Sequence, residues 1–289
     1  MRVGYACITA AVLIWAWWIV ATRLAVLQGI APLDLSLLRY GVPALVLLPW
    51  WWRQGLLPEG VPRWALAMMM GWGAPFVILM ALAMETAPVA HAAAIVPCVM
   101  PVFAAALARA MFGQRLGRAQ VLGFAAIGSG ALLVIGPLVA AGDGAALGGI
   151  ALLLGCAAGW AGYTVAFRCS GLGPVQAAGI VCAWSTLILV ALLPITGSSL
   201  TEVPVPEIAF HATAQGLLSG ALATAAFGVA IGGLGPARAA SFSALVPGLA
   251  AVIALAWLGE APGALDWAAL ALASFGVAAV NGVFGHRLA

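Results

Sequence analysis

The stretch WAWWIVATR at residues 15–23 returns as WAGYTVAFR at residues 160–168. Both copies begin with Trp and end with Arg eight positions later, and the second copy follows the first by 145 positions. Similarity of a chain with itself at a fixed distance indicates a repeated structural unit. We therefore predict that this protein contains the same unit twice.

A second set of landmarks supports the duplication at nearly the same distance. Three landmarks recur with a shift of 146: Pro101 with Pro247, Gly113 with Gly259, and Gln114 with Glu260. Each half holds five apolar stretches, and this odd number makes the second unit enter a membrane from the side opposite to the first. Inverted repeats of this kind are typical of secondary transporters. We expect the first repeat over residues 1–140 and the inverted second repeat over residues 141–289.

Composition places almost the whole chain in a lipid bilayer. Of its 289 residues, 65% are hydrophobic and 7% charged, and the mean hydropathy is +1.16, whereas soluble domains carry about 25% charged residues. Roughly 20 apolar residues form a helix that crosses a hydrocarbon core of about 30 Å. We predict an all-α membrane protein with ten transmembrane helices, arranged as two inverted five-helix repeats. The expected helices cover residues 3–26, 33–52, 63–84, 88–111, 118–138, 147–168, 174–195, 210–232, 237–258 and 264–284.

The distribution of charge predicts the orientation. With a cytoplasmic N terminus, most Arg residues lie in the inner loops and ends, and Glu59 is the only acidic residue in an inner loop. Because positive charge gathers on the cytoplasmic side, we predict a multi-pass membrane protein with both termini in the cytoplasm. The net charge of +3 follows from this arrangement, so no nucleic-acid partner is expected. The expected partners are the lipid bilayer and a small-molecule substrate, and the protein is expected to function as a monomer.

No motif indicates an enzyme, a metal site or a cofactor. The five Cys residues have no C-x-x-C spacing and the three His residues lie far apart, so a metal-ligand pattern is lacking. The segment Gly128-Ser129-Gly130 lacks the spacing of an intramembrane serine protease, and no H-E-x-x-H motif occurs. We predict a protein that is not an enzyme and needs no cofactor. A structural or receptor role is the alternative to transport.

Residues 101–114 and 128–134 carry the pattern of a known module. They read P-V-F-x3-L-x5-G-Q and G-x-G-A-L-L-V, which resembles the EamA module of the drug/metabolite transporter (DMT) superfamily. The second copy, with L-x-P at residues 245–247 and L-G-E at residues 258–260, is still closer to that module. The resemblance covers nearly the whole chain and implies two modules of five helices each. At Gln114 the module usually has Glu, so a carboxylate at this position is not required here.

The same resemblance implies a bacterial inner-membrane exporter of aromatic and other amino acids, with broad specificity. Few fixed charges and aromatic walls suit a neutral or zwitterionic metabolite, because phosphorylated substrates would need clustered Arg or Lys. We therefore predict amino-acid export by alternating access between the two repeats. The alternative is a multidrug or other small-metabolite efflux transporter of the same superfamily. A small multidrug pump would carry a buried acid in its first helix, and this first helix has none.

Candidate substrate contacts are aromatic and polar side chains within the expected helices. The site of an inverted-repeat transporter lies near the midplane, whereas Trp residues normally gather at the membrane interfaces and polar residues inside the membrane are costly. Helix packing is the alternative role for the aromatic residues, and a structural ion pair or helix cap is the alternative for Arg39. The predicted contacts are Trp17, Arg39, Trp72, Phe76, His91, Trp160, Tyr163, Trp184, Ser241 and Ser243.

Three prolines are predicted hinges. Pro97, Pro101 and Pro247 lie within expected helices, where a proline removes a backbone hydrogen bond and favours a kink. Since Pro101 and Pro247 are repeat counterparts, we expect them to mark paired gates, one opening outward and one inward. A static bend needed for packing is the alternative.

Overall fold

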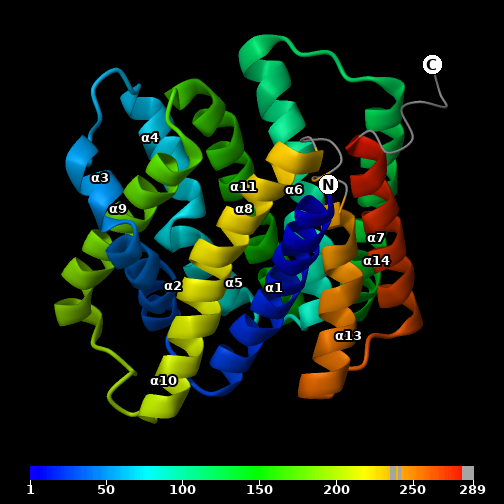
Figure 1. Ribbon diagram of the computed structural model, residues 1–289. Helices are drawn as coiled ribbons and strands as arrows, with labels where there is room; N and C mark the ends of the chain where they lie inside the picture. Colours follow the sequence, from blue (N-terminus) through cyan, green and yellow to red (C-terminus); the bar gives the residue numbers. More distant parts are fainter. Residues whose placement is uncertain (235–238, 240–241, 282–289) are drawn as a thin grey trace.

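Helices form the protein throughout the described part of the chain. The computed structural model describes residues 1–234, 239 and 242–281, and no strand occurs among them. Figure 1 shows the helices running between two ends of the molecule. We name the end that holds the N terminus the near end, and the opposite end, where α1 finishes, the far end.

The helices follow one another with short loops between them. The first half contains α1 (Arg2–Leu27), α2 (Pro32–Val46), α3 (Leu48–Gln54), α4 (Arg63–Met69), η1 (Met70–Trp72), α5 (Ala74–Ala83), α6 (Val89–Phe112) and α7 (Arg118–Ala141). The second half contains α8 (Gly144–Ser170), α9 (Pro174–Thr196), α10 (Val205–His211), η2 (Ala212–Leu222), α11 (Ala223–Leu234), η3 (Phe242–Leu245), α13 (Val246–Leu258) and α14 (Ala264–Val280).

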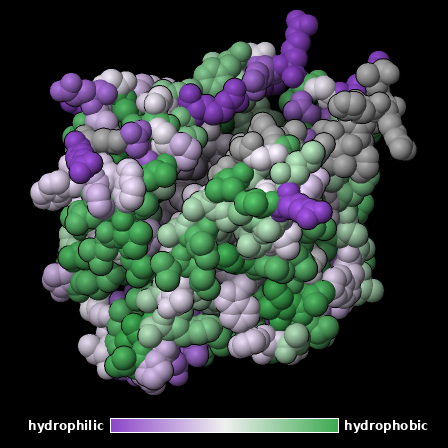
Figure 2. Space-filling view, in the orientation of Figure 1, coloured by the Kyte–Doolittle hydropathy of each residue, from purple (hydrophilic) through white to green (hydrophobic). Residues whose placement is uncertain are grey.

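Six helical segments in the described part of the chain are long and apolar enough to cross a membrane. They are α1, the segment Arg63–Ala83 made of α4, η1 and α5, and the helices α6, α7, α8 and α9. Figure 2 shows the matching surface, with hydrophobic residues over most of the middle and hydrophilic ones gathered mainly toward the top edge. The other four expected spans contain shorter helices. Residues 33–52, for example, divide between α2 and α3, where Pro43 and Pro49 cannot donate helical hydrogen bonds.

Glycine contacts establish the direction of α8. A Cβ built on Gly71 would lie 2.8 Å from the backbone oxygen of Gly159, and one built on Gly149 would lie 2.6 Å from Oγ1 of Thr86. Small residues of this kind allow two helix backbones to approach closely. The earlier residue of the first half thus meets the later residue of α8, so α8 is antiparallel to the segment Arg63–Ala83. Because α1 runs from the near end to the far end, as that segment does (Figure 1), α8 also runs against α1.

The crossing of α7 and α14 is nearly symmetric. A Cβ on Gly130 would lie 2.9 Å from the backbone oxygen of Ala269, and a Cβ on Gly276 would lie 2.6 Å from that of Gly123. The shift of 146 relates Gly130 to Gly276 and Gly123 to Ala269, so the two contacts are counterparts of each other. The last helix of each half therefore meets the other half in the same way.

Candidate functional site between the two halves

A buried polar cluster lies where α1, α2 and η2 meet. Trp18 and Thr22 on α1, Arg39 on α2 and Gln215 on η2 are each at most 8% exposed. The Trp18 indole N–H donates to the side-chain oxygen of Gln215, whose amide donates to Thr22 Oγ1 at 3.2 Å. Thr22 donates in turn to the backbone carbonyl of Trp18 at 2.9 Å. The cluster thus joins the two halves through buried side chains whose polar atoms find partners, as burial requires.

Arg39 brings a positive charge into this cluster. Its Nη1 donates to the backbone carbonyl of Gln215 at 2.8 Å, and its guanidinium carbon lies 4.9 Å from the centroid of the Trp18 ring, a cation–π distance. No described carboxylate lies within 4.0 Å of the guanidinium, so the structural ion pair considered for Arg39 is not formed there. Buried charges are normally paired. A backbone carbonyl and an aromatic ring, and no described carboxylate, therefore contact this charge.

The segment that meets Arg39 is unusual in its backbone. η2 is a π-helix of 11 residues, and π-helical segments occur frequently at functional sites. It packs tightly on α2, because a Cβ built on Gly216 would lie 2.7 Å from the backbone oxygen of Leu38. This close approach brings the carbonyl of Gln215 within hydrogen-bonding distance of Arg39.

Aromatic pairs beside the cluster contain four of the predicted contacts. Trp18 stacks on Phe76 with ring centroids 5.8 Å apart, and Phe76 meets Trp160 edge-on at 6.2 Å. Trp72 and Tyr163 lie 5.0 Å apart. All three centroid distances lie in the range that aromatic pairs prefer. The pairs combine α1, η1 and α5 of the first half with α8 of the second half, so these predicted residues lie between the halves.

Trp17 lies outside this cluster, and Trp18 occupies the position expected for it. The Trp17 ring contacts Trp257 at 4.8 Å and Phe210 at 6.2 Å, and Trp257 is 61% exposed. Consecutive residues of an α-helix point about 100° apart, so Trp17 faces away when Trp18 faces the interior. A signal for Trp18 is present in the sequence, because the hydroxyl of Thr22 lies one turn later on the same helical face.

Two of the remaining predicted contacts, His91 and Trp184, take part in other interactions. His91 is in the first turn of α6, and its Nε2 lies 3.3 Å from Oδ1 of Asp266 at the far end. Trp184 donates its indole N–H to a loop carbonyl at 2.9 Å and lines a groove of about 540 Å³ between α4 and α9. Ser243 lies in η3, and Ser241 lies outside the described residues.

The three predicted hinge prolines occupy two different settings. Pro97 and Pro101 lie inside α6, as expected. Pro247 lies in the first turn of α13, directly after η3, where a helix has no hydrogen bond for a proline to remove. Pro247 therefore lies where a 3₁₀ turn passes directly into an α-helix, and its role as a hinge stays a prediction.

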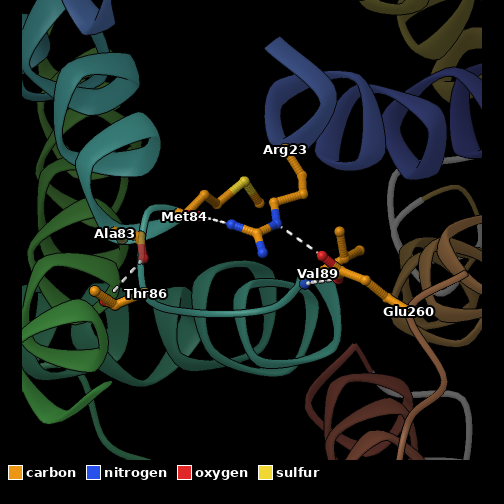
Figure 3. A network of polar contacts seen from close by, with 6 residues as sticks. All are labelled: Arg23, Ala83, Met84, Thr86, Val89 and Glu260. Atoms are coloured by element: carbon orange, nitrogen blue, oxygen red, sulfur yellow. Dashed lines mark hydrogen bonds and ion pairs between the residues drawn. The ribbon is translucent and has the colours of Figure 1, made fainter. Parts of the chain in front are cut away.

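A second polar network lies at the far end (Figure 3). Arg23 of α1 binds Glu260, which follows α13, with 2.7 Å between Nε and Oε1. Arg23 also donates to the carbonyl of Met84. The second oxygen of Glu260 accepts from the N–H of Val89 at 2.9 Å. Val89 is the first residue of α6, and such an N–H has no partner within its own helix. Glu260 thus ties the second half to both α1 and α6.

Two further polar contacts join the halves at the far end. Nε2 of His211 lies 2.7 Å from Oε1 of Gln28. Asp34, which is 1% exposed, accepts from the Ser198 hydroxyl at 2.8 Å and from the Ser199 backbone N–H at 2.6 Å. Together with the contact between His91 and Asp266, these interactions join the two halves at the far end.

Comparison with known proteins identifies a family, a relative and a solved structure that resemble this chain. The chain matches the model of the EamA-like transporter family twice, over residues 2–136 and 147–282. A relative from Streptantibioticus cattleyicolor, described as "Probable terminal-alkyne amino-acid exporter", is 30% identical over 195 residues, which are 66% of this chain and 64% of that relative. A crystal structure of a protein that is 21% identical superposes with a TM-score of 0.64 over 99% of both chains. That structure shares the fold.

Proposed function

The chain belongs to the EamA-like transporter family, and from this premise we propose that it exports amino acids across the bacterial inner membrane by alternating access. The relative described as an amino-acid exporter supports the substrate class. We also infer ten membrane-spanning segments in two inverted repeats. Two observations support this arrangement: the family model matches each half once, and α8 runs against α1.

We place the near end in the cytoplasm. It holds the N terminus, the loop between α3 and α4, and the loop between α6 and α7. In these loops or at the helix ends beside them lie Arg2, Arg53, Arg63, Arg109, Arg115 and Arg118. The far end holds the loops with Asp34, Glu85, Asp143, Glu202 and Glu260. Positive charge on the cytoplasmic side is the general rule for membrane proteins.

The observation that carries the substrate proposal is the buried guanidinium of Arg39. Its neighbours include a backbone carbonyl, the ring of Trp18 and the side chain of Tyr40, and no described carboxylate pairs with it. The carboxylate of an amino acid would accept charge-assisted hydrogen bonds from such a group. The rings of Phe76 and Trp160 beside the cluster suit apolar or aromatic substrate side chains. The site therefore provides one subsite for the carboxylate and one for the side chain.

Counterflow in proteoliposomes tests the proposal. Vesicles loaded with an unlabelled amino acid should take up the labelled one faster than protein-free vesicles, and a panel of aromatic and aliphatic amino acids would define the range. Cationic dyes form the second arm, since movement of dyes without amino acids would replace the proposal by the multidrug alternative. Movement of no solute would favour a structural or receptor role. A pH gradient imposed on the same vesicles distinguishes proton-coupled from facilitated transport.

A further inference from the structure

The loops that follow α6 and α13 have the same local structure. Gly113 and Gly259 end these helices in the left-handed conformation, with φ of 65° and 70°, and this conformation favours glycine at a helix end. The next residues are Gln114 and Glu260. These two side chains therefore leave the backbone at equivalent places in the two halves.

The partner of Glu260 also has a counterpart. Arg23 lies near the end of α1, and Arg168, 145 positions later, lies in the last turn of α8. In an inverted repeat, the far-end contact of Arg23 with Glu260 corresponds to a near-end contact of Arg168 with Gln114. Both of these near-end side chains are exposed here, and no hydrogen bond or ion pair joins them in the described part of the chain. The structure thus has one contact formed and its counterpart open.

We propose that Arg23 and Glu260 form the latch of the far gate, and that Arg168 and Gln114 form the corresponding latch of the near gate. This inference rests on the alternating-access function proposed above. The far latch joins opposite charges, whereas the near latch joins Arg to a neutral amide and lacks that attraction. The state closed at the far end is therefore favoured at rest. An empty exporter then waits open toward the cytoplasm, where it loads its substrate.

Distance measurement by double electron–electron resonance tests the two latches. Spin labels replace Glu85 and Leu265, which are exposed at the far end in opposite halves, after the five native cysteines are changed to Ala. Gln114→Glu supplies the charge that the near latch lacks, and the ratio of far-open to far-closed molecules should rise about fivefold, the effect of a partly exposed ion pair. Glu260→Gln should shift the same ratio in the same direction. The double variant Gln114→Glu/Arg168→Gln should lose the rise in this ratio, because the new Glu then lacks its Arg partner.

A matched control separates the latch from a general effect of charge. Gln120 caps α7 by accepting from the N–H of Gly117 at 3.0 Å, and a Glu at the same position can accept that bond. Gln120→Glu adds the same charge near the same loop and should leave the distances unchanged. Equal shifts in Gln114→Glu and Gln120→Glu would overturn the proposal, and so would no shift in Gln114→Glu. If Glu260→Gln fails to fold, the distances measured in Gln114→Glu still test the proposal, because position 114 is exposed.

The readout also separates this proposal from the proposed function. Label distances report the equilibrium between conformations and need no substrate. Latch variants that shift the distances in a protein without amino-acid counterflow would support the latches and refute export of amino acids. Counterflow in a protein whose latch variants leave the distances unchanged would support export and refute the latches.

Discussion

Replacing Arg39 with Met removes the charge from the buried cluster and keeps an unbranched side chain. The variant loses the hydrogen bond from Nη1 to the Gln215 carbonyl at 2.8 Å and the contact with the Trp18 ring at 4.9 Å. It also removes a charge that is buried without a carboxylate among the described residues, and the desolvation of such a charge costs free energy. We expect these effects to offset each other, so that the unfolding temperature changes by less than about 4 °C, or roughly 1 kcal/mol for a chain of this size.

The effect on the substrate should be larger. A hydrogen bond to a charged group contributes about 1.5–3 kcal/mol, and each 1.4 kcal/mol corresponds to about a factor of ten in affinity. With about 2 kcal/mol for the contact between guanidinium and carboxylate, the Kd for an amino acid should rise roughly thirtyfold. Arg39→Lys keeps the charge but loses the planar guanidinium. Its Kd for an amino acid should therefore lie between those of the wild type and Arg39→Met.

Binding of two compounds with the same side chain provides the assay. Isothermal titration calorimetry compares phenylalanine with phenethylamine, which has the same ring and amine but no carboxylate. The thirtyfold loss in Arg39→Met should appear for phenylalanine alone. Equal losses for both compounds, or a loss that accompanies a marked fall in unfolding temperature, would refute the assignment of Arg39 as the carboxylate contact.

Trp18→Phe should slow counterflow about fivefold because Gln215 loses its N–H donor, whereas Trp17→Phe should leave initial rates unchanged; the opposite ranking would show that the cluster is not the transport site. Gly276→Leu should destabilise the protein by about 1–3 kcal/mol, since even a Cβ there would lie 2.6 Å from the backbone oxygen of Gly123. Thermal unfolding in detergent measures this loss, and unchanged stability would contradict the close crossing of α7 and α14.

The long apolar runs made much of the fold predictable. The expected spans 118–138 and 174–195 fall within α7 and α9, because a chain in lipid satisfies its backbone groups by forming a helix. The interruptions were harder to predict. The segment Arg63–Ala83 changes to a 3₁₀ turn at η1, and there Gly71 touches Gly159 of the other half. The sequence signals a possible break, but packing between distant segments decides where it occurs.

The candidate site was predictable only in part. Arg39 stands out because a charge within an apolar stretch is costly. The choice between Trp17 and Trp18 depends on the rotation of α1, which its contacts with other helices determine. Gln215 lies in the π-helix η2. A π-helical turn is wider than an α-helical one and changes the direction in which the following side chains point. The hydropathy of the sequence does not reveal such a turn. His91 meets a partner 175 positions later, which local patterns do not reveal.

The crossing of α7 and α14 makes the two halves self-complementary. Gly123 of the first half meets Gly276 of the second, and Gly130 meets Ala269; the shift of 146 along the chain converts one contact into the other. At this crossing, nearly the same surface of each half contacts the other, as in an isologous dimer. The connection between α7 and α8 keeps both partners of this crossing within one molecule.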